Sequence, residues 1–149
     1  MILNSLTGCI FFICMYFTCI SGAYAKEKTD QDLTKLNSGF QAAITSNDTA
    51  KSRHFLKSII QTLGEDNNDN ITTSNSQYYI GVYYLLSGKN SDAINWLKLS
   101  VSMREQMKSY DEIYAKGLFN LCIAYSKLGD FSRMEQYSLK SLEIEKELY

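Results

Sequence analysis

Hydrophobic side chains recur at helical spacing through most of the chain. Residues 33–44 carry one such set and residues 55–63 carry a second. Apolar residues three or four positions apart lie on one face of a helix, so each set predicts an amphipathic helix. Asn47-Asp48 between them predicts a turn and a helix N-cap, and Gly64 predicts the end of the second helix.

A similar pattern follows in two copies at a constant offset of 41 residues. Residues 77–103 align with residues 118–144 so that apolar positions meet apolar positions and small residues meet small ones. Each copy contains a helical pattern, a short turn with glycine and a second helical pattern. The sequence therefore predicts an internal repeat of helical hairpins.

The turn of each copy carries its own signals. Gly88 and Gly129 predict helix ends in the left-handed conformation, which glycine adopts at least cost. Asn90 and Asp130 follow them and are candidate N-caps of the next helices. The small residue Gly81 predicts that the two helices of a hairpin cross closely there. Cys122, also small, takes the corresponding place in the next copy.

This arrangement resembles the tetratricopeptide repeat, in a variant whose period of about 41 residues exceeds the standard 34. The resemblance covers about half the chain, and a fainter copy precedes it. Serine replaces the late alanine of the usual signature, and Cys122 and Met134 replace two other small residues. The positions that define the repeat are Gly81, Tyr84, Gly88, Ala93, Leu121, Tyr125, Gly129 and Phe131.

The resemblance implies an all-α fold, a short right-handed superhelical solenoid of about three helix–turn–helix hairpins. The expected boundaries are a degenerate first repeat over residues 30–64, a solvated loop over 65–74, a second repeat over 75–108 and a third over 111–149. No proline interrupts these helices.

Residues 1–25 differ from the rest of the chain because they carry no charged side chain. An apolar run from Cys9 to Phe17 is followed by Ala23-Tyr24-Ala25, a small-x-small pattern that signal peptidase accepts. We therefore expect a signal peptide over residues 1–25 and an exported domain over residues 26–149, periplasmic or secreted. The alternative is an uncleaved membrane anchor over Leu6–Ala25, which is long enough to span a bilayer.

The resemblance also implies where a partner binds. In tetratricopeptide proteins the first helices of successive repeats line a concave groove that takes peptides. The corresponding residues are Asn75, Tyr78, Val82, Leu85, Lys116, Phe119, Asn120 and Ile123. The groove would be apolar and aromatic. The alternative is that Tyr78, Val82, Phe119 and Ile123 only pack the repeats against each other.

Composition and charge narrow the function classes. The formal net charge of −1 does not fit a nucleic-acid surface, which needs a clustered basic face. The single histidine, His54, has no partners at ligand spacing, and the sequence contains no phosphate-binding loop and no CxxC pair. We expect no catalytic residues, no metal and no cofactor, and hence no enzyme.

The sequence therefore predicts a non-catalytic scaffold for protein–protein interaction outside the cytoplasm, with a protein or peptide partner. A membrane would be involved only through the N-terminal segment. The alternative is a truncated sensory or regulatory repeat portion of a longer bacterial signalling protein. No polar capping helix follows the last repeat pattern, so self-association through the C-terminal helix is a further expectation.

Overall fold

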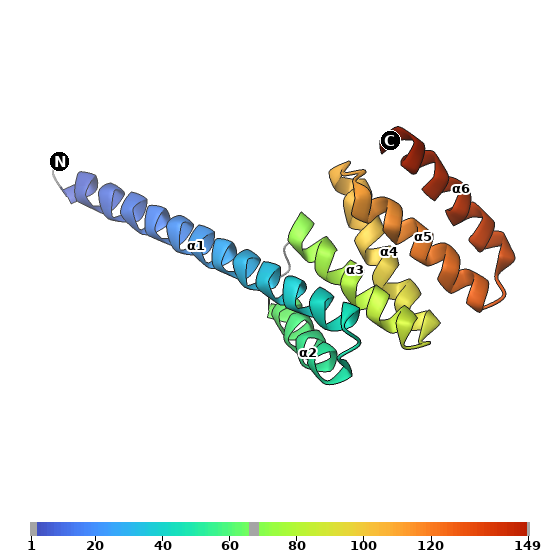
Figure 1. Ribbon diagram of the computed structural model, residues 1–149. Helices are drawn as coiled ribbons and strands as arrows, with labels where there is room; N and C mark the ends of the chain where they lie inside the picture. The colour runs from blue at the N-terminus through green and yellow to red at the C-terminus, as the bar shows by residue number, and fades with distance from the viewer. Residues whose placement is uncertain (1–2, 66–68, 149) are drawn as a thin grey trace.

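The computed structural model describes the backbone of residues 3–65 and 69–148 and the side chains of residues 22–64 and 69–148. Within this part the chain is all α, as predicted, and forms three consecutive helical hairpins (Figure 1). The helices are α1 (Leu3–Thr45), α2 (Thr49–Glu65), α3 (Ile71–Leu86), α4 (Asn90–Met107), α5 (Glu112–Lys127) and α6 (Phe131–Leu148).

The three hairpins turn in the same way. Asn47, Gly88 and Gly129 have left-handed φ angles of 55°, 75° and 75°. The residue after each donates its backbone N–H to the carbonyl five positions earlier, at 2.9 Å, 2.9 Å and 3.0 Å. These bonds supply donors to backbone carbonyls that the last turn of a helix would otherwise leave unpaired. The faint first hairpin thus uses the same turn, with asparagine in place of glycine because asparagine tolerates this conformation best after glycine.

Side-chain caps begin most of the helices. The backbone N–H groups of Lys51 and Arg133 donate to Asp48 and Asp130, each at 3.0 Å. The prediction that Asn90 caps α4 is wrong. The N-cap is Lys89, which makes no side-chain cap bond. In all three hairpins the N-cap is the residue directly after the one with the left-handed φ angle. The conformation of the turn therefore determines which residue is the N-cap.

Two predicted boundaries differ from the structure. Helix α3 begins at Ile71, so residues 71–74 are helical and not loop, because the Asn70 side chain accepts the Thr73 N–H at 2.8 Å and caps the helix. Helix α2 continues through Gly64 to Glu65. Gly64 is not among the glycines with positive φ, so it does not end the helix as predicted.

Helix α1 is longer than the first repeat predicted from residue 30. It starts at Leu3, and its N-terminal half extends away from the other helices (Figure 1). Side chains up to residue 21 lie outside the described residues, so the signal peptide or anchor over residues 1–25 stays a prediction. Among the described residues, no helix combines the length and the apolar character needed to cross a membrane.

The core consists of two clusters, one at each junction between hairpins. The first joins α1, α2 and α3 around Leu33, Phe40, Ile59 and Ile80. The second joins α3 to α6, and residues such as Leu97, Leu118 and Leu121 are fully buried in it. Burial of these side chains is the main source of stability, because each contributes about 1.5–3 kcal/mol over an exposed one.

Ser100 and Ser141 stand where the usual signature has its late alanine. Each joins the two helices of its hairpin by a hydrogen bond. The Ser100 hydroxyl donates to the Ser74 carbonyl at 2.8 Å, and the Ser141 hydroxyl donates to the Ala115 carbonyl at 3.2 Å. Ser100 and Ser141 are almost fully buried. A small hydroxyl therefore lets the helices approach and satisfies its own polar group at the same time.

A polar contact ties α6 back to α4 beside the second core cluster. The Lys140 ammonium lies 2.5 Å from Glu105 Oε1, and the buried Tyr114 hydroxyl donates to the same oxygen at 2.9 Å. Partial burial raises the pKa of the Glu105 carboxyl, but the hydrogen bonds from Lys140 and Tyr114 outweigh this effect. The pKa of Glu105 is therefore held below its ordinary value.

Candidate partner-binding surface

The first helices of the three hairpins, α1, α3 and α5, pack against one another in sequence order. The predicted groove residues come from α3 and α5. Side chains at positions i, i+3, i+4 and i+7 share one helix face, and Lys116, Phe119, Asn120 and Ile123 on α5 have this spacing.

Most apolar residues of the predicted groove belong to the second core cluster or pack against it. Tyr78 and Leu85 are buried in the second core cluster, and Val82 and Ile123 are half-buried against it. These four side chains therefore stabilise the junction between α3 and α5. Only their outer edges are available to a ligand.

Phe119 is the exception among the apolar groove residues. Its side chain is 52% exposed, although it lies on the same face of α5 as Ile123. A half-exposed aromatic ring on a surface of packed apolar residues is typical of a contact for another protein, since such rings supply much of the energy of protein interfaces.

Two polar residues, Lys116 and Asn120, lie on the same face of α5 as Phe119. The Asn120 amide donates to the Tyr78 hydroxyl at 3.4 Å and so orients the phenol at the junction. Burial raises the pKa of the Tyr78 phenol, while the nearby Lys116 ammonium acts in the opposite direction. The net effect is a pKa above the ordinary value, so the Tyr78 phenol stays neutral at physiological pH. Lys116 itself lies 2.6 Å from Glu112, and both side chains are more than half exposed.

Asn75 lies at the far end of α3 and belongs to a different set of contacts. Its side-chain oxygen accepts from Nη2 of Arg104, whose Nη1 pairs with Asp111. Arg104 is completely buried, which the sequence did not predict. The only sequence signal for its burial is the acidic residue seven positions later, Asp111, the N-cap of α5. Arg104 and Asp111 come together only when the chain turns between α4 and α5. Asn75 is thus a structural residue.

Tyr79 and Tyr83 of α3 contact the first hairpin. The Tyr79 hydroxyl donates to Gln41 Oε1 at 3.1 Å, and the rings of Tyr83 and Phe40 have centroids 5.7 Å apart. The bunched tyrosines of α3 therefore serve both junctions: Tyr78 belongs to the second cluster, Tyr83 packs against the first, and Tyr79 and Tyr84 pack against both.

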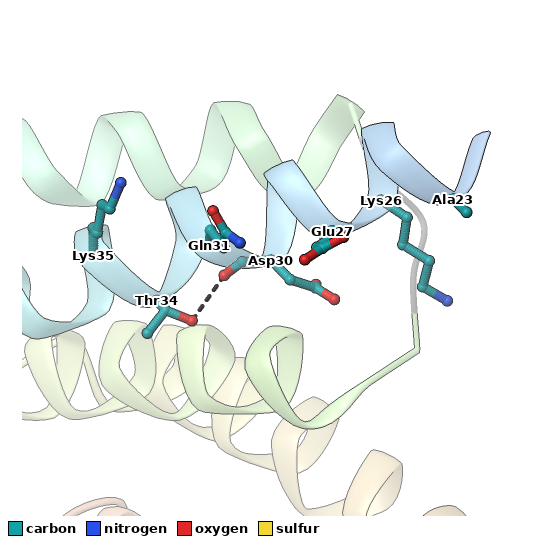
Figure 2. A pocket seen from close by; sticks show the side chains of 7 residues that line it. All are labelled: Ala23, Lys26, Glu27, Asp30, Gln31, Thr34 and Lys35. Carbon is teal, nitrogen blue, oxygen red and sulfur yellow. Dashed lines mark hydrogen bonds between the residues drawn. The ribbon is translucent and has the colours of Figure 1, made fainter. Parts of the chain in front are cut away.

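A separate open hollow lies along α1, away from the predicted groove. Figure 2 shows the side chains that line it, all from residues 23–35 of this one helix. Thr34 donates to the Asp30 backbone carbonyl at 2.7 Å, and the Asn70 amide donates to the Asp30 carboxylate at 2.7 Å. The first bond lies within α1 and the second attaches α1 to the N-cap of α3, so the polar groups serve helix structure and packing.

The described residues contain no group of three or more side chains suited to hold a metal ion. His54 is exposed on α2, where its ring contacts Phe55 at a centroid distance of 5.9 Å. On α5 near Phe119, Asn120 donates to Tyr78 and Lys116 pairs with Glu112. The surface is therefore suited to apolar contact, with an amide and an ammonium group at its edge.

Comparison with known proteins gives a structural match. No protein family and no curated protein matches the sequence. The fold is similar to the N-terminal domain of stress-induced protein-1 (STI-1) from C. elegans, with a TM-score of 0.59 and 19% identity over 78% of this chain and 86% of that one. That domain is a tetratricopeptide-type helical repeat. The chain therefore has a tetratricopeptide-like helical repeat fold.

Proposed function

We propose that this chain is a non-catalytic protein-interaction module of the longer-period tetratricopeptide type, which binds a partner segment on the α3–α5 surface around Phe119. The 41-residue spacing of its three left-handed turns supports the longer period. The observation that carries the binding proposal is the exposure of Phe119 between Lys116 and Ile123. Tyr78 and Val82 on α3 belong to the apolar core cluster that α3 shares with α5.

The mechanism is burial of an apolar partner side chain against the Phe119 ring. Asn120 and Lys116 lie at the edge, where amide and ammonium groups can bind a partner backbone or carboxylate. Because Tyr78 and Ile123 are already packed, the surface is largely formed before binding, and little ordering cost opposes the contact.

Phe119→Ala is expected to weaken peptide binding by roughly tenfold or more, because truncation of an exposed aromatic anchor commonly has this effect. The probe is a set of peptides selected on the wild-type protein from a random display library, and the measurement is fluorescence anisotropy. Leu99→Ala is the matched control, since Leu99 on α4 is 49% exposed. Equal binding by the Phe119 variant and the wild type would show that peptides bind elsewhere.

We also propose that the chain is exported, periplasmic or secreted, with cleavage after Ala25. Supporting this, residues 22–28 are exposed on α1, and Leu33 is the first buried residue described. Removal of residues 1–25 would therefore leave both core clusters intact.

Mass spectrometry and N-terminal sequencing of the protein from an exporting host are expected to give a chain that begins at Lys26. A chain expressed without residues 1–25 should unfold at the same temperature as the longer form, because no described core residue is lost. An intact Met1 in the membrane fraction would support the anchor instead and contradict cleavage.

A further inference from the structure

Helix α6 has two apolar faces, of which one is packed. Met134, Tyr137 and Ile144 contact the second core cluster. On the opposite side lie three large apolar side chains with exposed fractions between 49% and 66%. We call them the outer stripe: Phe131, Leu139 and Leu142. Their spacing of eight and three residues places them on one face, because eleven residues make about three helical turns.

The outer stripe lies at one end of the stack of hairpins. Helix α6 is the last layer and α1 projects from the opposite end, so no described helix lies over the outer side of α6 (Figure 1). Leu139 and Leu142 are neighbours one helical turn apart, and neighbouring exposed apolar side chains mark an interaction surface more often than scattered single ones do.

Two opposite charges lie within the stripe. Glu135 stands between Phe131 and Leu139, and Lys146 lies one turn beyond Leu142. Neither forms an ion pair with any residue that the structure describes. Leu139 and Leu142 lie at equal distances on either side of the midpoint between residues 140 and 141, and so do Glu135 and Lys146.

We propose that Leu139 and Leu142 of the outer stripe bind the same two residues of a second copy of this chain, as an antiparallel pair of α6 helices around a two-fold axis. With the axis at the midpoint between residues 140 and 141, Leu139 of one copy faces Leu142 of the other. Glu135 of each copy then faces Lys146 of the other. A self-complementary surface of this kind is what a two-fold symmetric dimer requires. This proposal concerns a different surface from the one around Phe119.

A further repeat fits the outer face of α6 less well. Helix α4 places Ile94 and Val101 in the cluster that α5 shares. The residues 41 positions later are Glu135 and Leu142, so only the second is apolar. An added hairpin of the same geometry would bury a carboxylate, whereas the antiparallel pair matches Glu135 with a lysine.

A contact through one helix pair is small, so the dimer is expected to be weak and to depend on protein concentration. Sedimentation velocity across a concentration series should show monomer passing into dimer. Leu139→Ser/Leu142→Ser is expected to abolish the dimer, while Leu86→Ser/Leu99→Ser, at two exposed leucines elsewhere, leaves it unchanged. Circular dichroism checks that each variant is folded.

Charge reversal tests the register. Glu135→Lys and Lys146→Glu should each raise the dimer dissociation constant by roughly tenfold at low salt, because each turns two attractive contacts into repulsive ones. The double variant should recover wild-type affinity. A monomer at every concentration, or a dimer that survives both serine substitutions, would overturn the proposal. A double variant as weak as the single ones would overturn the antiparallel register.

Discussion

Leu97→Ala is expected to lower the free energy of unfolding by about 2–5 kcal/mol, the usual cost of a buried leucine-to-alanine change. Leu97 is fully buried in α4, where α3 crosses it at Gly81. A Cβ atom on residue 81 would lie 2.6 Å from Leu97 Cγ and 3.2 Å from the Leu97 backbone nitrogen. The leucine therefore fills the space that glycine leaves.

The same geometry predicts that the cost of alanine at position 81 depends on the side chain of residue 97. In the wild type, Gly81→Ala should destabilise by about 1 kcal/mol, because the overpacking cost exceeds the gain in helix propensity. In the Leu97→Ala background this cost should disappear, because the side-chain clash is gone and the propensity gain offsets the remaining 3.2 Å approach to the backbone nitrogen of residue 97.

Urea unfolding followed by circular dichroism measures the four free energies of this double-mutant cycle. Leu99→Ala, in the same helix at an exposed position, serves as the control and should change stability by less than about 0.5 kcal/mol. An effect of Gly81→Ala that is equal in both backgrounds would show that the two side-chain positions do not compete for space.

The crossing of Gly81 and Leu97 also shows how far the repeat could be followed in the sequence. The next hairpin has Cys122 and Ser138 at these positions, a larger residue on the first helix and a smaller one on the second. In the first hairpin a Cβ on Gly39 would lie 2.4 Å from the Phe55 ring. Gly39 is 42 residues before Gly81. An offset of 41 therefore aligns Gly81 with Phe40, and the equivalence of Gly39 and Gly81 does not show in the sequence.

The turns could be predicted because each hairpin turn needs one residue with a left-handed φ angle. Glycine and asparagine are the residues that adopt positive φ at little cost, and they recur at the three hairpin turns. The start of α3 could not be predicted from its composition, because residues 71–76 contain mostly serine, threonine and asparagine. Their helix forms because Ser74 and Ser76 are buried by the neighbouring helices, which override local preference.

The predicted groove was harder to define than the fold. Helix positions that face a groove also face the next hairpin, so spacing alone does not separate binding residues from packing residues. The structure places Tyr78 and Leu85 in the core and leaves Phe119 half-exposed. That difference depends on how closely α5 approaches α3 near each residue, which follows from the tertiary packing.

Arg104 and Asp111 form the other feature that tertiary packing creates. The guanidinium is completely buried, whereas the Asp111 side chain is 43% exposed. Asp111 also caps α5, because its Oδ1 accepts the Tyr114 N–H at 3.0 Å. One carboxylate therefore neutralises a buried cation and begins a helix at the join between the second and third hairpins.

Asp111→Ala is expected to lower the free energy of unfolding by about 3–5 kcal/mol, because it leaves a buried guanidinium without its anion and removes a cap. Asp130→Ala is the matched control. Asp130 caps α6 in the same way, but its ion-pair partner Arg133 is 61% exposed. Its loss should cost only about 1 kcal/mol.

Asp111→Asn separates the two roles of this carboxylate, because asparagine keeps the capping oxygen and loses the charge. We expect its cost to fall between those of the two alanine variants, with the difference from Asp111→Ala close to the value of one cap. Denaturant unfolding of the three variants measures this order. Equal costs for Asp111→Ala and Asp130→Ala would mean that water or the neutral Asn75 amide satisfies Arg104, and that its ion pair adds nothing to the join.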